Sequence, residues 1–296
     1  MHQLKKNLPT LLLVLVFLTG VGLLLYPTFA DWWNSFHQSR AVAAYMDSVT
    51  ELDTSKYDEI LASADSYNQM LAQTGVLWTM DEKQEEAYRE ELNISDSGIM
   101  GYIDIPKINI TLPIYHGTEE EVLQVAIGHL SGTSLPVGGT NTHCVVSGHR
   151  GLPSARLFTD IDKLVDGDTF TMTVLNRTVT YQVDLVRIVE PTDLSDLQIE
   201  QGNDLCTLVT CTPYGINTHR LLVRGHRVAN AQGDAPVIAD AMQIESIYIA
   251  PFLAVPILII LIISMFMITG KQKRRNRQVR ETMKAFESGM NDEYED

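Results

Sequence analysis

Three side chains in this sequence have types and spacing that suit nucleophilic chemistry. Cys211 ends the apolar run Thr207–Cys211 and precedes a turn with Pro and Gly, which predicts a strand that presents the thiol at its end. Arg220 lies nine residues further on, and an antiparallel hairpin that pairs it with Cys211 would put both side chains on one face. A guanidinium in that place could favour the thiolate or donate hydrogen bonds to an oxyanion.

The third side chain is His149, which stands in the segment Ser147–Gly151 beside glycines that let a ligand backbone approach. A cysteine nucleophile needs a partner that exchanges protons near neutral pH, and imidazole does so. Each residue also has a plainer interpretation. Taken alone, Cys211 fits a buried structural cysteine, Arg220 fits a surface ion pair, and a histidine in a turn is weak evidence. Other histidines are interpreted as structural: His143, His219 and His226.

We expect neither a metal site nor a cofactor, because Cys206, Cys211 and His219 lack CxxC or HExxH spacing. The three cysteines do not form a disulfide framework. Cys206 and Cys211 point to opposite faces of one predicted strand, whereas a Cys144–Cys206 bridge stays open. The net charge of −15 gives the chain no electrostatic footprint for nucleic acid.

Two long uncharged stretches predict that the chain is tied to a membrane. No charged residue occurs between Lys6 and Asp31, and roughly 20 apolar residues are enough to cross a bilayer. This first stretch is a retained anchor or, in the alternative, a cleaved signal peptide. The second stretch, residues 246–270, is followed at once by basic residues that mark the cytoplasmic side. We therefore expect both termini in the cytoplasm and the catalytic domain outside the cell.

The exported part divides into two regions by its periodicity. An acidic region with helical spacing predicts two or three helices, and the region after it has many short alternating runs, which predict a β-barrel or β-sandwich. A short helix is expected over 122–127, with Thr118 and Glu121 as its capping box. We expect six parts: an N-terminal tail with its anchor (1–30), a helical extension (31–97), a catalytic region (98–230), a linker (231–245), a span (246–270) and a cytoplasmic tail (271–296).

Several of these segments resemble motifs of the sortase family. The segment Thr207–Gly215, continued by Arg220, resembles the TLxTC…R signature of that family. Ser147–Pro153 resembles the segment that holds the family histidine, and Gly101–Ile108 with Leu112–Gly117 resembles the start of the barrel. These motifs are long and stand in the expected order, and the resemblance covers most of the exported domain.

The resemblance implies an eight-stranded barrel and a cysteine transpeptidase that cleaves an LPxTG-like sorting signal after its threonine. It implies Cys211 as the nucleophile that forms a thioester, His149 as general acid and base, and Arg220 as the residue that holds the substrate carbonyl or oxyanion. The helical extension and the second span resemble the class C branch, in which a pilin lysine resolves the thioester. The implied partners are pilin or surface-protein substrates, an acceptor amine and the membrane.

The sequence departs from that branch at one place. Pilin sortases commonly carry a lid with an Asp-Pro-aromatic triplet, and the corresponding stretch Val76–Asp81 has none. Trp78 either plugs the groove in its place or is an ordinary loop aromatic. Three other functions stay open: a sortase that anchors surface proteins to a cell-wall precursor, a non-catalytic exported binding domain, and a hydrolytic cysteine protease.

Overall fold

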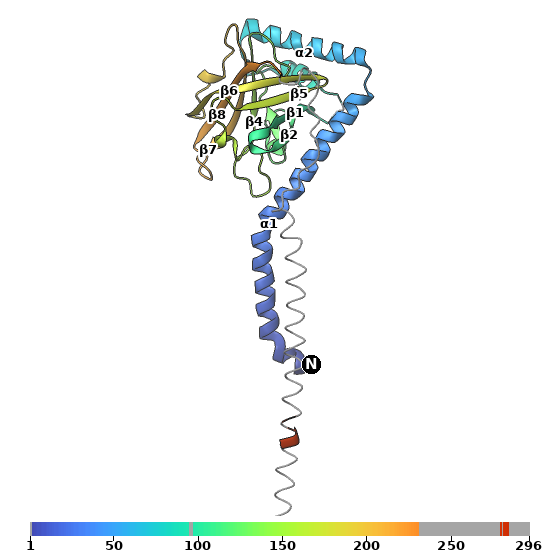
Figure 1. Ribbon diagram of the computed structural model, residues 1–296, viewed down its shortest axis with the longest axis vertical. Helices are drawn as coiled ribbons and strands as arrows, with labels where there is room; N and C mark the ends of the chain where they lie inside the picture. Colours follow the sequence, from blue (N-terminus) through green and yellow to red (C-terminus); the bar gives the residue numbers. More distant parts are fainter. Residues whose placement is uncertain (1, 95–96, 231–278, 280, 284–296) are drawn as a thin grey trace, which may run out of the picture. The chain divides into compact units, whose positions relative to one another are not determined.

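The computed structural model describes residues 2–94, 97–230, 279 and 281–283. The expected linker, second span and most of the C-terminal tail lie outside the described residues. Within the part described, eight strands close into a barrel, which confirms the expected fold (Figure 1). The strands are β1 (Ile99–Ile105), β2 (Ile110–His116), β3 (Ile127–His129), β4 (Thr142–Ser147), β5 (Thr169–Val174), β6 (Arg177–Val189), β7 (Asp204–Thr212) and β8 (His219–Val228).

The order of strands around the barrel is β1-β2-β3-β4-β7-β8-β6-β5. Two pairs, β2–β3 and β4–β7, are parallel, and all the others are antiparallel. The hairpins expected from sequence are present as β5–β6 and β7–β8. Closure leaves no free sheet edge, so the backbone of each strand is paired on both sides over part of its length.

Alternate side chains of the strands pack on two sides of the barrel wall. In β4, Cys144 and Val146 belong to the large interior core, whereas Val145 between them belongs to a smaller cluster on the outside. In β8, Val223 points inward and Leu222 joins the same outer cluster as Val145. The wall therefore has an apolar patch on its outer face as well as a packed interior.

The expected helix over 122–127 is wrong in its bounds and its cap. Helix α4 covers Glu120–Leu123, its N-cap residue Glu119 makes no side-chain cap bond, and Ile127 belongs to strand β3. Ile127 pairs in parallel with Ile114 of β2, a partner thirteen residues earlier in the chain. This tertiary pairing overrides the local helical pattern, because barrel closure recruits the apolar end of the segment as a strand.

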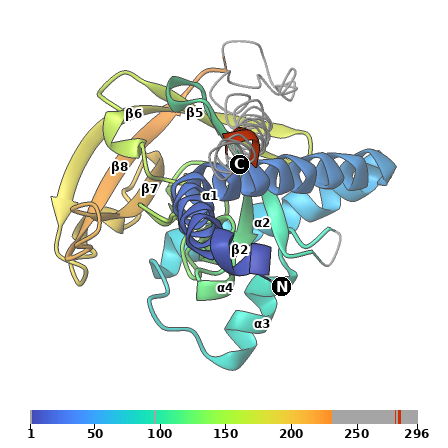
Figure 2. The same cartoon turned by 90° about the horizontal axis from the view of Figure 1, so that it is seen from below.

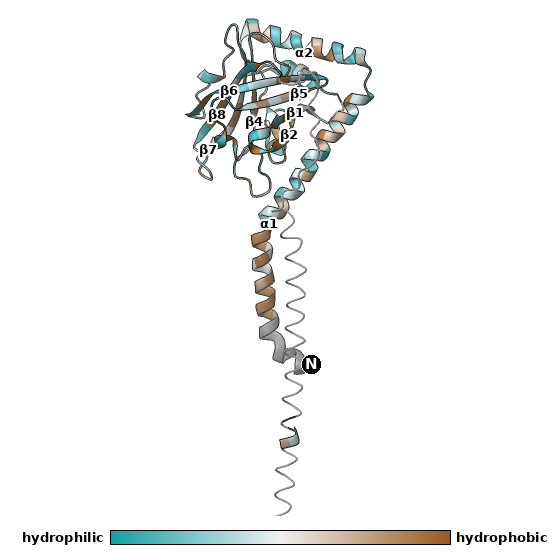
Figure 3. Cartoon of the chain, viewed as in Figure 1, coloured by the Kyte–Doolittle hydropathy of each residue, from teal (hydrophilic) through white to brown (hydrophobic). Residues whose placement is uncertain are grey.

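Three helices precede the barrel: α1 (His2–Glu51), α2 (Thr54–Thr74) and α3 (Glu82–Glu90). Helix α1 is the one helix among the described residues that is long and apolar enough to cross a membrane. It runs without a break past residue 30, where the sequence changes from apolar to mixed composition. Figure 3 shows this change as brown along the early part of α1 and mixed colours after it.

Helix α3 is fastened to the barrel by one buried tyrosine. The Tyr88 hydroxyl lies 2.9 Å from Nδ1 of His129 in β3 and accepts a hydrogen bond of 3.1 Å from the Gly117 amide. Burial raises the pKa of Tyr88 well above its ordinary value, so the phenol stays neutral and can serve as donor and acceptor. The start of α3 is set by a capping box between Asp81 and Gln84.

Helix α1 passes along the side of the barrel that β2 forms (Figure 2). Its buried residue Tyr45 donates a hydrogen bond of 3.0 Å to the Met100 carbonyl of β1. The same hydroxyl accepts a bond of 2.9 Å from the Leu175 amide in the β5–β6 turn. One phenol therefore satisfies two buried backbone groups of the barrel.

Replacing Tyr45 with phenylalanine removes both bonds and leaves the Met100 carbonyl and the Leu175 amide buried without this partner. We expect the free energy of unfolding to fall by about 2 kcal/mol, since each stranded group costs on the order of 1 kcal/mol or more. The measurement is thermal or denaturant unfolding of the full chain in detergent. Tyr214→Phe is the control, because that side chain is 60% exposed. If both variants lost the same free energy of unfolding, the stabilising role of the two Tyr45 hydrogen bonds would be contradicted.

Candidate active site

The β7–β8 hairpin brings Cys211 and Arg220 together. The two residues are register partners, with Thr212 opposite His219 at the end of the ladder. The hairpin register predicted from sequence is therefore confirmed. Directly opposed side chains on an antiparallel pair lie on one face with Cβ atoms about 5 Å apart. Cys211 is partly exposed, and the strand that carries it is anchored in the barrel.

His149 reaches the same place through the parallel pairing of β4 with β7. Ser147 is the register partner of Val209, and the pairing continues beyond the strand. The Gly148 amide donates to the Val209 carbonyl at 3.0 Å, and the Thr210 hydroxyl donates to the Gly148 carbonyl at 2.7 Å. If this register is continued by two residues, it puts His149 opposite Cys211 at the ends of the two strands, because aligned parallel strands advance together at about 4.8 Å separation.

The backbone around His149 leaves no room for larger residues. A Cβ at Gly148 would lie 2.8 Å from side-chain carbons of Ile127 and Phe158, so glycine is required there. The chain then folds back, and the Phe158 amide donates to the His149 carbonyl at 3.1 Å. Arg150 pairs with Asp162 and lies 3.4 Å from the Thr212 hydroxyl. These contacts hold the His149 segment against the end of β7.

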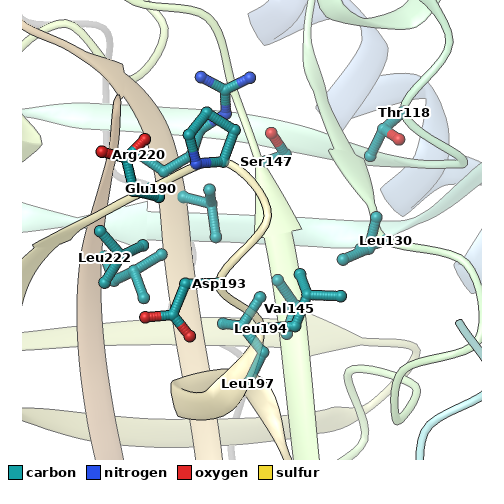
Figure 4. A pocket seen from close by; sticks show the side chains of 13 residues that line it. Thr118, Leu130, Val145, Ser147, Glu190, Asp193, Leu194, Leu197, Arg220 and Leu222 are labelled. Atoms are coloured by element: carbon teal, nitrogen blue, oxygen red, sulfur yellow. The ribbon is translucent and has the colours of Figure 1, made fainter. Parts of the chain in front are cut away.

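A pocket of about 200 Å³ lies on the outer face of β4, β7 and β8, with Arg220 at one side of it (Figure 4). Its floor is the outer apolar cluster, and the β6–β7 connection covers one side of it. Arg220, the register partner of Cys211, is part of the lining, and so is Ser147, two residues before His149. The apolar lining residues are Leu130, Val145, Val189, Leu194, Leu197, Val209 and Leu222.

The rim of the pocket is polar and includes two carboxylates and one guanidinium. Glu190 and Asp193 of the β6–β7 connection face it, together with Thr118 and Arg220 (Figure 4). Glu190 lies 3.2 Å from Nε2 of His219, a contact that joins the β6–β7 connection to the start of β8. An apolar floor with a few polar groups at its rim suits an extended peptide that places aliphatic side chains in the pocket.

The sequence did not single out Glu120, which the structure places beside His149. One carboxylate oxygen of Glu120 lies 3.6 Å from Nε2 of His149. This nitrogen is buried and makes no hydrogen bond within the described residues. Glu120 belongs to an acidic run, Glu119–Glu121, whose composition alone does not mark it as a neighbour of a histidine 29 positions away.

The other two cysteines lie in the barrel wall, away from the exposed end of β7. Cys144 and Cys206 are register partners on β4 and β7, and both are buried. The bridge that the sequence left open is absent, since both are free thiols. Burial raises the pKa of the Cys206 thiol well above its ordinary value, which keeps it protonated.

The remaining histidines have partners of their own. His143 is buried between the Gln198 carbonyl and the Thr207 hydroxyl, at 2.7 Å from each. Burial lowers the pKa of His143, so it is neutral near pH 7. Nδ1 of His226 lies 3.6 Å from Asp184, near the opposite end of β8 from Arg220.

Trp78 lies in the connection between α2 and α3 and is 37% exposed. It is not among the residues that line the pocket. Its neighbour Leu77 donates a backbone hydrogen bond of 2.9 Å to the Gly132 carbonyl in the β3–β4 connection. A Cβ at Gly132 would lie 2.0 Å from the Leu77 carbonyl oxygen, so the two connections are in close contact.

Comparison with known proteins points to one family. A sortase domain matches residues 103–228. Sortase D of Bacillus subtilis is 30% identical over 131 residues, which are 43% of this chain and 63% of that protein. The chain therefore spans less than two thirds of that relative.

Solved structures match over nearly their whole length. Sortase C1 from Streptococcus agalactiae is 57% identical, with a TM-score of 0.64, and the match covers 64% of this chain and 99% of that one. Sortase C of Clostridium perfringens, solved with the C-terminal cell wall sorting motif, is 41% identical with a TM-score of 0.58. That match covers 65% of this chain and 100% of the other.

The burial of the three thiols predicts selective alkylation. In the native chain, iodoacetamide should modify Cys211 and leave Cys144 and Cys206 slower by roughly 10²-fold or more, since buried thiols react only after local opening. Mass spectrometry of the peptides after timed labelling measures the three rates. In denaturant all three should react alike. Comparable native rates for Cys206 and Cys211 would contradict the placement of the thiols.

Proposed function

Because this chain belongs to the sortase family of cysteine transpeptidases, we propose that it cleaves an LPxTG-like sorting signal after its threonine and transfers the acyl group to a pilin lysine. The pairing of Cys211 with Arg220 is the observation that carries the proposal. It joins a partly exposed thiol and a guanidinium on one face, beside the His149 segment and an apolar pocket.

In the first half of the proposed reaction, the Cys211 thiolate attacks the threonine carbonyl carbon of the sorting signal. The C–N bond to the following glycine breaks, His149 gives a proton to the departing amine, and a thioester forms on Cys211. In the second half the acceptor amine attacks the thioester carbonyl and gives a proton to His149. The Cys211 sulfur leaves, and a new amide joins the two proteins.

In this mechanism Arg220 stabilises the negative charge that develops on the substrate oxygen. Its Nη1 is held by the His219 carbonyl at 3.1 Å, which fixes the plane of the guanidinium beside the strand end. The remaining N–H groups of the fork are suited to donate to an oxyanion on a tetrahedral intermediate. The apolar pocket next to Arg220 would receive the aliphatic residues of the sorting signal that precede the threonine.

The choice of a pilin lysine as acceptor rests on the class C relatives. Two of them share 57% and 41% identity with this chain over nearly their whole length. The helices α2 and α3 before the barrel agree with the extension expected for that branch. The second candidate is a sortase that joins surface proteins to a cell-wall precursor, for which the chemistry is the same and the amine differs.

We further propose that the sorting reaction takes place at the outer surface of the cell membrane. Helix α1 supplies one span, and residues 246–270 are assigned as the second, with both termini in the cytoplasm. In this assignment residues 31–97 form the extension, 98–230 the catalytic barrel and 231–245 the linker.

Pilin polymerisation predicts covalent ladders. The full chain in detergent, incubated with a pilin that carries a sorting signal, should give products that resist sodium dodecyl sulfate, and Cys211→Ala should give none. Cys206→Ala is the matched control on the same strand and should keep the activity. A product formed only with a cell-wall precursor amine would favour the second candidate, and release of the free acid alone would indicate a protease.

Arg220→Lys separates charge from geometry. Lysine keeps the positive charge but loses the planar fork, so we expect the acylation rate to fall by about 10²-fold or more. Arg224→Lys is the control, because Arg224 lies on the same strand and pairs with Asp184 and Glu200 instead. Rapid-quench measurement of the thioester gives both rates. A rate within a few-fold of the native one would mean that charge alone suffices at position 220.

Trp78 is proposed as the resting plug of the substrate groove in place of the missing triplet. Removal of a covering indole in Trp78→Ala should raise the rate at which a small thiol reagent modifies Cys211, because no side chain then has to be displaced before the thiol reacts. Thr79→Ala, at the exposed neighbouring position, is the control. Equal modification rates in the native chain and Trp78→Ala would rule out a lid role for this residue.

A further inference from the structure

Just beyond its apolar part, helix α1 carries a polar stripe that contacts the barrel. Asp31, Asn34 and Gln38 stand at intervals of three and four residues and so share one face of the helix. The Asn34 amide donates to the Ser154 carbonyl at 2.7 Å, and the Gln38 amide donates to the Val125 carbonyl at 2.8 Å. Further along α1, Tyr45 makes hydrogen bonds to the barrel.

The third residue of the stripe adds a bond to the same loop. A carboxylate oxygen of Asp31 accepts a hydrogen bond of 2.9 Å from the Arg156 amide. Ser154 and Arg156 belong to the loop that leaves His149 and returns to it at Phe158. Val125 follows helix α4, which carries the Glu120 carboxylate that faces His149. The stripe therefore contacts both the loop that follows His149 and the segment that follows the helix of Glu120.

A different side of the same turns is aromatic and exposed. Phe29, Trp33 and Phe36 follow the same helical spacing and are 51%, 50% and 37% exposed. The rings of Phe29 and Trp33 stack with centroids 6.3 Å apart. The Arg40 guanidinium lies 5.7 Å from the Phe36 ring. Aromatic rings with a cation at the end of an apolar span are typical of the bilayer interface.

The distances along the helix agree with that environment. At a rise of 1.5 Å per residue, a span of about 20 residues that begins at Leu11 ends near Ala30. Trp33 and Phe36 then lie about 5 and 9 Å beyond the end of the span. The headgroup layer on one side of a bilayer is about 5 to 8 Å thick. The aromatic side chains therefore cover the headgroup layer and its outer boundary, and the polar stripe begins in the same turns.

We propose that residues Phe29–Phe36 of α1 form an interfacial collar, which binds the headgroup layer through its aromatic face and positions the His149 loop through Asp31 and Asn34. The collar is thus both a lipid-binding surface and a positioning element for the active site. The predicted effect of the collar on the rate of the sorting reaction rests on the proposed function. The site would then lie close to the bilayer surface.

Depth-dependent quenching tests the lipid contact. The full chain with Trp78→Phe, which leaves Trp32 and Trp33 as its tryptophans, is placed in nanodiscs of equal parts phosphatidylcholine and phosphatidylglycerol. Lipids brominated near the headgroup should quench the fluorescence more than lipids brominated at the chain end. Quenching by neither lipid, or stronger quenching from the chain end, would overturn the collar.

Variants of the stripe test the positioning of the loop. Asn34→Ala should lower kcat/KM for a sorting peptide by about three- to tenfold, the factor expected for one lost hydrogen bond. Asp31→Ala should act likewise, and Asp31→Asn should restore much of the rate, because an amide oxygen still accepts from Arg156. Ser35→Ala, exposed on the same turn, is the matched control and should leave the rate unchanged.

Hydrogen exchange provides a readout that does not depend on the activity. In nanodiscs, Asn34→Ala and Asp31→Ala should speed amide exchange in residues 150–157, whereas exchange in β7 and the melting temperature should stay as in Ser35→Ala. Unchanged exchange in this loop would overturn the positioning role even if the chain proves to be an active transpeptidase. Faster exchange in a chain without activity would instead contradict the proposed function alone.

Discussion

The arrangement of the site depends on the pairing of β7 with both of its neighbours. On one side the parallel ladder with β4 aligns Ser147 with Val209, and on the other the antiparallel ladder with β8 aligns Cys211 with Arg220. A slip of one residue in either ladder would turn a side chain to the opposite face of the wall. The hydrogen bond from Thr210 to Gly148 holds the first alignment beyond the end of β4.

The closed barrel keeps these two registers in place. Cys206 and Leu208 of β7 are fully buried in the interior core, so a shifted β7 would expose apolar groups and bury polar ones. The outer face of the same strands carries the apolar pocket floor, and the ends of the strands carry the reactive groups. Rigid packing inside the wall thus positions accessible chemistry outside it.

Helix α1 connects the site to an apolar segment that is long enough to cross a membrane. Helix α1 begins with an apolar stretch, continues as a face of polar residues that hold the loop after His149, and ends with Tyr45 and its neighbours against β1. Because one uninterrupted helix makes all these contacts, the orientation of the site and the position of the anchor are coupled. This coupling supports the expectation that the barrel works close to the bilayer.

The sequence by itself determined the local features: the apolar span, the alternating strands, and the hairpin in which Cys211 faces Arg220. These depend on residues close together in the chain, where periodicity and turn residues carry the information. Only the tertiary structure decided that Ile127 is a strand residue and that β4 runs parallel to β7. It also decided that Glu120 lies beside His149 and that the stripe of α1 contacts the loop after His149. Parallel pairing joins Cys144 to Cys206 across more than sixty residues, and Asn34 meets Ser154 across 120. Such contacts are selected by closure of the barrel and burial of its core, and no local pattern specifies them.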